Sequence, residues 1–333
     1  MFINRHRLAH LLPPSHYFSL EQHELELERL FSPSWHLLAT RAELASDGDF
    51  LTLELFGRPL LLRNFQGEIR AFLNVCAHRH CLLTHVRRGR DSRFRCQYHG
   101  WEYNKEGRTG RIPDAGCFRP FDRASAHLKT FPTETCGDLI FVCLDDCAQS
   151  LKDHLGPYHA YCAGSFAGAF RQAWTFEAQY ECNWKVVIEN SLESYHVPCL
   201  HQKTLGNYPV EEKCEHELTD RFTWFRTPET SRAGRFLASL MRRWGVPVTR
   251  SYEHHHLHPH MTFAAMDVFR LLQVVFPISP TSCRHKAWLF TARGLQPGLL
   301  RELSGWALAR LVRTFARRIV LEDIPIYADV QRD

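Results

Sequence analysis

The fold of this chain is decided by two segments, Cys76-Ala77-His78-Arg79-His80 and Cys96-Gln97-Tyr98-His99-Gly100-Trp101. Each segment supplies one cysteine and one histidine at metal-ligand spacing, so the two pairs can converge on one metal centre. Thiolate and imidazole ligands suit either an iron-sulfur cluster or zinc. A zinc finger would place its two cysteines together and its two histidines together, whereas here each segment contributes one of each.

The pattern resembles the cluster-binding motif of Rieske proteins, Cys-x-His followed by Cys-x-x-His, and the likeness continues into Arg79 and Gly100-Trp101. The resemblance implies a [2Fe-2S] cluster bound by Cys76, His78, Cys96 and His99. Two histidine ligands raise the reduction potential above that of an all-cysteine ferredoxin, so the cluster would accept electrons easily. His80 and His85, which lie between the pairs, are expected to be loop or surface histidines.

Cys81 distinguishes two branches of this resemblance. The high-potential Rieske proteins of electron-transport chains carry an extra cysteine in each half of the motif, and the two are joined as a disulfide. Cys81 could be half of such a bridge, but the corresponding position of the second segment is Tyr98. The missing partner favours the oxygenase branch.

Residues 183–201 contain a second group of candidate ligands. Glu193 and His196 are three residues apart and would share a helical face. His196 and His201 are five apart, about 140° around an ideal helix, so an unbroken helix could not bring both to one metal. Pro198 lies between them and removes the backbone donor that a continuing helix needs. The sequence therefore predicts a kink.

Two histidines and one carboxylate form the facial triad of iron(II) enzymes that activate O₂, and this triad leaves coordination positions open for O₂. The carboxylate must come from elsewhere in the chain. The segment Glu322-Asp323-Ile324-Pro325, followed by Asp329-Val330-Gln331-Arg332, resembles the C-terminal Glu-Asp…Gln-Arg segment of Rieske oxygenases. By that resemblance Asp323 is the third ligand beside His196 and His201, with Glu322 and Glu189 as the alternatives.

Glu193 matches the acidic residue that, in this family, links subunits through hydrogen bonds to one cluster histidine and one iron histidine. Many members have Asp here. In having Glu at this position, the chain resembles the branch that acts on quaternary ammonium compounds, such as the carnitine and glycine betaine oxygenases. A carboxylate beside a metal-binding histidine also orients the imidazole, so Glu193 is the candidate catalytic residue. The alternative is an ordinary solvated helix carboxylate.

The composition is that of a globular enzyme, with 44% hydrophobic and 23% charged residues in a chain of 333. The net charge of +5 is small and the basic residues are scattered, so no nucleic-acid partner is expected. No apolar run reaches the ~18 residues of a membrane helix, and no membrane partner is expected. Basic residues interrupt positions 1–14, which removes the apolar centre of a signal peptide. A cytoplasmic location is expected.

The 12 cysteines of such a chain indicate thiols or metal ligands more than a disulfide framework. Six of them stand alone among apolar or mixed neighbours, where a buried free thiol is the usual outcome. These six are Cys136, Cys143, Cys162, Cys182, Cys214 and Cys283.

The order of helix-favouring runs, short β-like runs and glycines along the sequence predicts an α+β protein of two domains. Residues 1–35 are expected to form a helical lead-in, because Ser19 can cap the helix-favouring run 20–31. Residues 36–150 contain short β-like runs punctuated by glycine, which predicts an antiparallel β domain, the Rieske [2Fe-2S] domain of the resemblance. Residues 151–333 would form the catalytic domain with the mononuclear iron.

This second domain mixes β-like runs at 269–276 and 285–291 with helices near 183–196 and 298–323. The mixture predicts an antiparallel sheet flanked by helices, in the START-like helix-grip arrangement that the resemblance implies.

Histidines and aromatic residues in the second half are candidates for a cavity wall. The histidines His254, His255, His256, His258 and His260 could bind metal, although a strand with alternate residues facing inward explains their spacing equally well. One or two of them can line a substrate cavity. The aromatic candidates are Tyr208, Trp224, Phe225, Phe263 and Phe276. Such residues form plain core or, for a cationic substrate, a favourable ring face.

Both motifs together resemble the catalytic alpha subunit of Rieske non-haem iron oxygenases, the ring-hydroxylating and quaternary-ammonium family. The resemblance implies O₂-dependent hydroxylation or oxidative demethylation of a small organic substrate, a quaternary amine being one candidate. It implies a [2Fe-2S] cluster, a mononuclear Fe(II), electrons from NAD(P)H through a separate reductase or ferredoxin, and a homotrimer. The alternatives are an aromatic ring-hydroxylating dioxygenase and, in another class, a Rieske electron-transfer protein, which would need nothing after residue 150.

Overall fold

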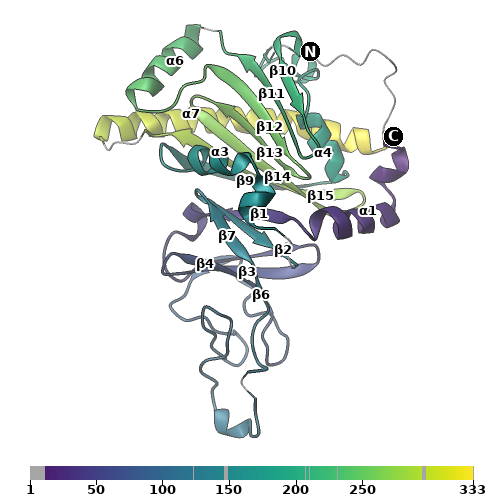
Figure 1. The fold of residues 1–333 in the computed structure, drawn as a ribbon, viewed down its shortest axis with the longest axis vertical. Coiled ribbons are helices and arrows are strands. Elements are labelled where there is room, and N and C mark those ends of the chain that lie inside the picture. The colour runs from purple at the N-terminus through teal and green to yellow at the C-terminus, as the bar shows by residue number, and fades with distance from the viewer. Residues whose placement is uncertain are drawn as a thin grey trace. The chain divides into compact units, whose positions relative to one another are not determined.

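The computed structural model describes residues 12–122, 124–145, 149–206, 208–209, 211–230, 232–294 and 298–332. The chain forms two compact units, shown in Figure 1. One unit comprises residues 28–159, and the other joins residues 1–27 to residues 160–333. The N-terminal segment therefore belongs to the unit that contains the second half of the chain.

Short antiparallel strands build the unit of residues 28–159. A sheet of three strands has the order β1-β8-β7, and a sheet of five has the order β5-β2-β3-β4-β6. The strands are β1 (Trp35–Thr40), β2 (Asp49–Leu55), β3 (Arg58–Phe65), β4 (Glu68–Leu73), β5 (Arg88–Arg90), β6 (Thr130–Phe131), β7 (Thr133–Cys136) and β8 (Leu139–Cys143). Helices α2 (Leu151–Leu155) and α3 (Tyr158–Ser165) follow. The predicted antiparallel β architecture is confirmed.

Two-residue turns set the register of the central strands. Phe56 and Gly57 join β2 to β3 with φ of 50° and 71°, and Gln66 and Gly67 join β3 to β4 with φ of 54° and 93°. Two successive residues with positive φ match the twist of antiparallel strands, and glycine adopts such angles without a steric cost. The glycines that punctuate this part of the sequence thus mark strand ends.

A sheet of seven antiparallel strands forms the centre of the other unit, in the order β10-β11-β12-β13-β14-β15-β9. The strands are β9 (Phe170–Tyr180), β10 (Glu215–Leu218), β11 (Phe222–Pro228), β12 (Ser251–Leu257), β13 (Met261–Met266), β14 (Phe269–Ser279) and β15 (Ser282–Ala292). The helices are α1 (Leu20–Glu26), α4 (Trp184–Ser191), α5 (Val197–Leu200), α6 (Arg232–Arg243) and α7 (Leu299–Arg332). The predicted α+β class is confirmed, and both predicted β-like runs lie in strands.

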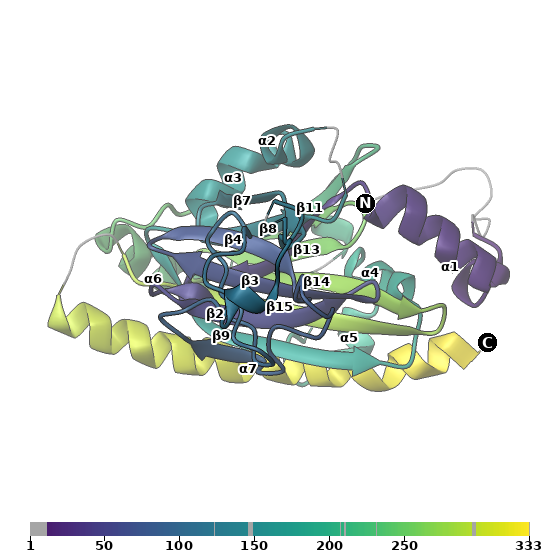
Figure 2. The same cartoon turned by 90° about the horizontal axis from the view of Figure 1, so that it is seen from below.

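Helix α7 lies along the seven-stranded sheet, as Figures 1 and 2 show. Its Val312 packs into an apolar cluster with Ala264, Leu271, Ala287 and Leu289 of the sheet. The helix continues through Pro325, beyond the predicted end at residue 323, because packing on the sheet compensates for one lost backbone hydrogen bond. Neither α7 nor another helix of the described chain is long and apolar enough to cross a membrane.

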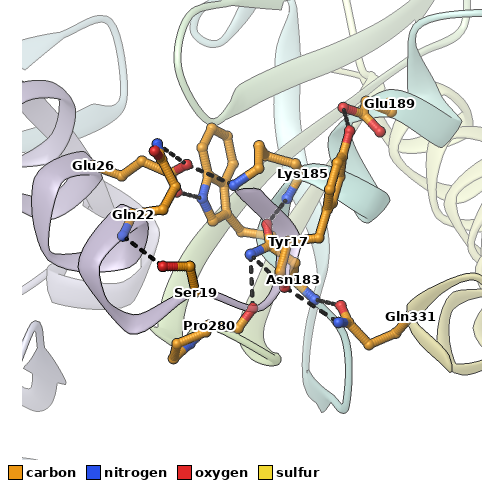
Figure 3. A network of polar contacts seen from close by, with 10 residues as sticks. Tyr17, Ser19, Gln22, Glu26, Asn183, Lys185, Glu189, Pro280 and Gln331 are labelled. Carbon is orange, nitrogen blue, oxygen red and sulfur yellow. Dashed lines mark hydrogen bonds and ion pairs between the residues drawn. The ribbon is translucent and has the colours of Figure 1, made fainter. Parts of the chain in front are cut away.

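A polar network, drawn in Figure 3, fixes the start of α4 against both α1 and the end of α7. The buried Lys185 Nζ lies 2.7 Å from Oε1 of the buried Glu26, whose Oε2 accepts a hydrogen bond from Trp184 Nε1 at 2.8 Å. Asn183 caps α4, and its backbone N–H donates to Gln331 Oε1 at 2.6 Å. Ser19 caps α1 as predicted, since its hydroxyl accepts from Gln22 N.

The helix predicted over residues 183–196 is shorter than expected, because α4 ends at Ser191. The Glu193 carboxylate accepts hydrogen bonds from the backbone N–H groups of Tyr195 and His196. A side chain that bonds neighbouring backbone groups offers them an alternative to the helix. Glu193 and His196 therefore meet in a turn and not on a helical face.

The prediction of a free thiol at Cys143 is wrong, because this cysteine is disulfide-bonded. The apolar neighbours of a cysteine do not reveal whether a second sulfur comes within bonding distance. The other five cysteines of this set are buried, and none of them forms a disulfide.

We predict that Glu26→Gln lowers the free energy of unfolding by about 3–5 kcal/mol, because it leaves the Lys185 ammonium buried without a counter-charge. Urea unfolding followed by circular dichroism measures the loss. The matched control is Glu302→Gln, which removes the exposed Arg171–Glu302 pair at 3.1 Å and should cost less than about 1 kcal/mol. The double variant Glu26→Leu/Lys185→Met should recover most of the stability, and equal losses in the two single variants would contradict a structural role for the buried pair.

Candidate metal centres

The connection from α4 to α5 positions both candidate histidines of the second motif. His196 is the N-cap of α5 and His201 is its C-cap, and their ring centroids are 5.3 Å apart. Pro198 lies in the first turn of α5, where its missing N–H costs nothing. Pro198 therefore begins a new short helix and does not kink a continuous one, and the short helix brings both imidazoles to the same place.

Asp323 of α7 completes the group. One ligand atom from each of His196, His201 and Asp323 can be chosen so that all three lie within 4.8 Å of one another. His201 is buried, and its Nε2 lies 3.1 Å from Asp323 Oδ1. Asn190 Nδ2 donates to the same carboxylate oxygen at 3.3 Å. Two imidazole nitrogens and one carboxylate oxygen at this separation are a donor set that fits one iron(II) ion.

Two further carboxylates hold the imidazole nitrogens that point away from this group. Glu193 Oε1 lies 2.5 Å from His196 Nδ1, and Glu322 Oε2 lies 2.8 Å from His201 Nδ1. Burial raises the pKa of Glu193 and Glu322, but hydrogen bonds to the histidines outweigh it, so both pKa values lie below the ordinary value. Ionised carboxylates at Nδ1 fix each ring with Nε2 directed at the metal position.

The alternative carboxylates lie elsewhere. Glu322 contacts the far nitrogen of His201 and accepts a hydrogen bond from Thr204 Oγ1 at 2.7 Å. Glu189 accepts from the Tyr17 hydroxyl at 2.6 Å, a contact drawn in Figure 3. The structure thus brings Asp323 to the two histidines and gives the neighbouring acids other partners. The sequence offered no signal for the roles of Thr204 and Asn190.

A cavity of about 530 Å³ adjoins the three-residue group. Its walls come from α4, the α4–α5 connection, strands β11 to β15 and α7, and they are mainly apolar, for example Leu271, Val312 and Ile319. This volume suits a small organic molecule. Of the five aromatic candidates, Tyr208 and Phe225 line the cavity. Phe263 and Phe276 are buried core, and Trp224 is half-buried.

The histidine-rich strand β12 contributes to the cavity through His254, which stacks on Phe225 with ring centroids 5.3 Å apart. His255 instead stacks on the core residue Phe263. Within the part of the chain that the structure describes, these histidines form no separate group of three metal ligands. Burial, followed by nearby histidines, lowers the pKa of His254 to about 3, so its imidazole is neutral.

The two ligand loops of the first unit have the same backbone hydrogen bonds. Cys76 N donates to Cys81 O at 2.8 Å, and Cys96 N donates to Trp101 O at 2.8 Å. Cys76 and Cys96 are buried, whereas His99 is exposed. The predicted surface histidines, His80 and His85, are exposed.

The candidate ligands of these loops lie close together. The rings of His78 and His99 are 4.9 Å apart between centroids, and His78 stacks on the buried Trp101 at 4.6 Å. Tyr103, which the sequence analysis did not single out, has its hydroxyl 3.0 Å from Cys76 Sγ. Two buried thiols and two adjacent imidazoles are a donor set that fits a [2Fe-2S] cluster with mixed ligands.

Comparison with known families assigns a family to each half of the chain. Residues 34–132 match the family described as the Rieske [2Fe-2S] domain, and residues 167–333 match the ring hydroxylating alpha subunit (catalytic domain). The chain belongs to the ring-hydroxylating alpha subunit family. The cofactors of this family are a [2Fe-2S] cluster in the Rieske domain and a mononuclear iron in the catalytic domain, as the resemblance implied.

Individual relatives include dioxygenases and monooxygenases. The large subunit of anthranilate 1,2-dioxygenase from Acinetobacter baylyi is 33% identical over 54% of this chain and 40% of the relative. The oxygenase subunit of carnitine monooxygenase from Acinetobacter pittii is 28% identical over 62% of this chain and 56% of the relative. The matches thus span about half the length of these curated relatives.

Solved structures share the fold. A quaternary ammonium Rieske monooxygenase in complex with L-carnitine superimposes with a TM-score of 0.77 at 20% identity, covering 96% of this chain and 84% of that chain. A naphthalene 1,2-dioxygenase variant bound to phenanthrene gives 0.79 at 21% identity, covering 96% and 79%.

We predict that His201→Ala and Asp323→Ala lose the mononuclear iron while the cluster spectrum stays intact, because each variant removes a ligand from one centre only. Glu322→Gln is the matched control: it should keep the iron with affinity lowered roughly 10–100-fold, since the change weakens the contacts of Glu322 with His201 Nδ1 and Thr204 but removes no proposed iron ligand. Iron content after dialysis and the electron paramagnetic resonance spectrum of the reduced cluster measure both centres. Iron that is lost in Glu322→Gln but retained in Asp323→Ala would reverse the two roles.

Proposed function

We propose that the chain is the oxygenase component of an enzyme that uses O₂ to hydroxylate or oxidatively demethylate a small organic substrate. The observation that carries the proposal is the group of His196, His201 and Asp323 at the wall of a largely apolar cavity. A protein that only transfers electrons does not need a substrate cavity beside a second metal site. The chain also carries a Rieske domain, which gives the same molecule a site for electrons.

When bound, the cluster would supply electrons and the iron would supply a centre that activates O₂. The residues of the chain do the remaining work. Glu193 and Glu322 hold the Nδ1 protons of the two histidines, so both rings keep one tautomer. The apolar walls exclude water and keep the substrate beside the metal position.

We infer that Cys76, His78, Cys96 and His99 hold the cluster, and that a separate reductase or ferredoxin passes electrons to it from NAD(P)H. We also infer a homotrimer in which Glu193 of one subunit accepts a hydrogen bond from a cluster histidine of the next. Two solvent-exposed side chains support this inference. His99 is exposed, and the Glu193 side chain is 43% exposed although its Oε1 contacts His196 Nδ1. A related quaternary ammonium monooxygenase has been described in terms of inter-subunit electron transfer.

The substrate we propose carries no carboxylate. The described residues that line the cavity include no lysine or arginine, but they include Glu193, Glu229 and Asp323. Burial lowers the pKa of His285 to about 4, and His254 is neutral as well, so neither supplies a positive charge. Burial lowers the pKa of His201, but hydrogen bonds to Asp323 and Glu322 outweigh it and raise the pKa, and these two carboxylates already balance a charge on this ring. A buried carboxylate without a cationic partner costs several kcal/mol. Anthranilate and carnitine, for which two relatives are named, both carry a carboxylate.

An uncharged substrate would still find one directional contact. His254 lines the cavity at 6% exposure, and among the described residues no hydrogen bond reaches its ring. A neutral imidazole can donate to or accept from a hydroxyl, carbonyl or amide group. We therefore propose that His254 orients a polar group of an otherwise apolar substrate.

A quaternary amine without a carboxylate is the second candidate. Tyr208, Phe225 and Tyr252 line the cavity together with Glu229. The ring centroids of Tyr208 and Tyr252 are 6.2 Å apart, and those of Phe225 and Tyr252 are 6.0 Å apart. Adjacent aromatic faces attract a quaternary ammonium group.

We predict that benzamide binds at least about 100-fold more tightly than the near-isosteric benzoate, roughly 3 kcal/mol for one unpaired buried charge. Anaerobic calorimetry on the full chain, with and without mononuclear iron, measures both affinities, and phenyltrimethylammonium tests the second candidate. Met266→Lys places a cation at the cavity wall and should restore benzoate binding, whereas Met266→Gln should not. Tighter binding of benzoate to the iron-free parent chain would refute the charge argument.

Turnover is tested separately from binding. Protein reduced with dithionite and freed of reductant is exposed to O₂ and the compound that binds, and the products are identified by mass spectrometry. An oxygenated or demethylated product in amounts close to the cluster content is the expected result. Binding without any product would reject the proposed function and leave the preference for uncharged compounds intact.

We predict that Glu193→Gln keeps both metals but slows reoxidation of the reduced cluster by O₂ in the presence of a bound compound, because an amide cannot accept hydrogen bonds from two imidazoles. Stopped-flow absorbance follows the reoxidation. Glu189→Gln, which alters a carboxylate of α4 that accepts a hydrogen bond from the Tyr17 hydroxyl, is the control and should behave as the parent. Loss of iron in Glu193→Gln would make Glu193 a ligand, and an unchanged rate would make it an ordinary carboxylate.

A further inference from the structure

The Cys81 thiol lies beside the candidate cluster ligands, and the proposed function gives it no role. Cys81 is half-buried and free. Its Sγ lies 3.6 Å from Cys96 Sγ, a distance at which a thiol can donate a weak hydrogen bond to sulfur. The contact joins the first ligand loop to the cysteine of the second.

Backbone hydrogen bonds hold the two sulfurs in this contact. Cys76 N donates to Cys81 O at 2.8 Å, which fixes Cys81 at the end of the first loop. Gln97 N donates to Leu83 O at 2.9 Å, which fixes the residue after Cys96 beside the chain that follows Cys81. The approach of Cys81 to Cys96 is thus built into the backbone of both loops.

The direction of the hydrogen bond follows from the chemistry of a cluster ligand. A cysteine that binds iron does so as a thiolate and has no proton to donate. Cys96 must therefore be the acceptor, and Cys81 is the donor. The Cys96 sulfur also accepts from Tyr98 N at 3.4 Å. Donors aimed at ligand sulfurs favour the reduced cluster, because the reduced cluster carries more negative charge.

We propose that the Cys81 thiol donates a hydrogen bond to the Cys96 sulfur and thereby raises the reduction potential of the cluster. The inference rests on the proposed ligand set, because Cys81 acts through Cys96. Cys81 occupies the position of a disulfide cysteine in the high-potential Rieske pattern, yet with Tyr98 at the corresponding position of the second segment it forms no disulfide. Cys81 thus helps to set the driving force for electron transfer, through the reduction potential of the cluster.

The test is a redox titration of the cluster in the full chain, followed by circular dichroism, with iron and sulfide content measured on each sample. Cys81→Ala removes the donor and should shift the midpoint potential to a lower value. Cys81→Ser keeps an O–H donor at the same position and should bring the potential back toward that of the parent. Cys117→Ser, which changes an exposed free thiol of the same unit, should leave the potential unchanged.

A second measurement detects only the molecules that hold a reduced cluster, so it applies to Cys81→Ala even if this variant binds its cluster poorly. Pulsed electron paramagnetic resonance of the reduced parent protein in D₂O should show an exchangeable deuteron near the cluster that is absent in Cys81→Ala and present in Cys117→Ser. A Cys81→Ala protein with the parent potential and the parent deuteron signal would overturn the proposal. A Cys96→Ala protein that keeps a Rieske-type cluster, and loses it when Cys81→Ala is added, would instead show that Cys81 is itself a ligand, and it would reject the ligand set.

Discussion

The position of α7 relative to α4 is the constraint on which the catalytic unit depends. The proposed iron site needs two histidines that follow α4 and one aspartate on α7, more than a hundred residues later. Two contacts fix where α4 begins: the hydrogen bond from Asn183 N to Gln331, and the buried ion pair of Lys185 with Glu26. The first contact also fixes the end of α7, where Gln331 lies. A shift of either helix by one turn, about 5.4 Å, would separate the ligands.

The same arrangement occurs at both histidines of the proposed iron site. Each imidazole has an ionised glutamate at Nδ1, Glu193 for His196 and Glu322 for His201. The adjacent residues Glu322 and Asp323 can both serve His201 because the ring lies between them and presents one nitrogen to each. Orientation of the rings is thus set by charge, while the apolar cavity beside them sets what can approach.

The sequence determined the chemistry of both centres, because ligand types and their spacing are local properties. The paired Cys-His loops, the two histidines around Pro198 and the turns at Gly57 and Gly67 could all be read from neighbouring residues. Local patterns were less reliable for helix limits. Helix α4 ended at Ser191, before the predicted limit, where the Glu193 carboxylate binds backbone N–H groups. Helix α7 continued through Pro325 because its packing on the sheet was stronger than the local signal.

Tertiary structure alone decided which distant groups meet. The sequence could name Asp323 only by resemblance, since a carboxylate on a helix carries no mark of its partner, and it gave no sign that Glu322 would hold the far side of His201. The charge of the cavity was equally hidden, because it depends on which residues of strands β11 to β15 and of helices α4 and α7 face inward. The contact of Cys81 with Cys96 arises from two loops that only the folded backbone brings side by side. Distances of a few ångströms between residues far apart in the chain are set by packing, and packing is a property of the whole unit.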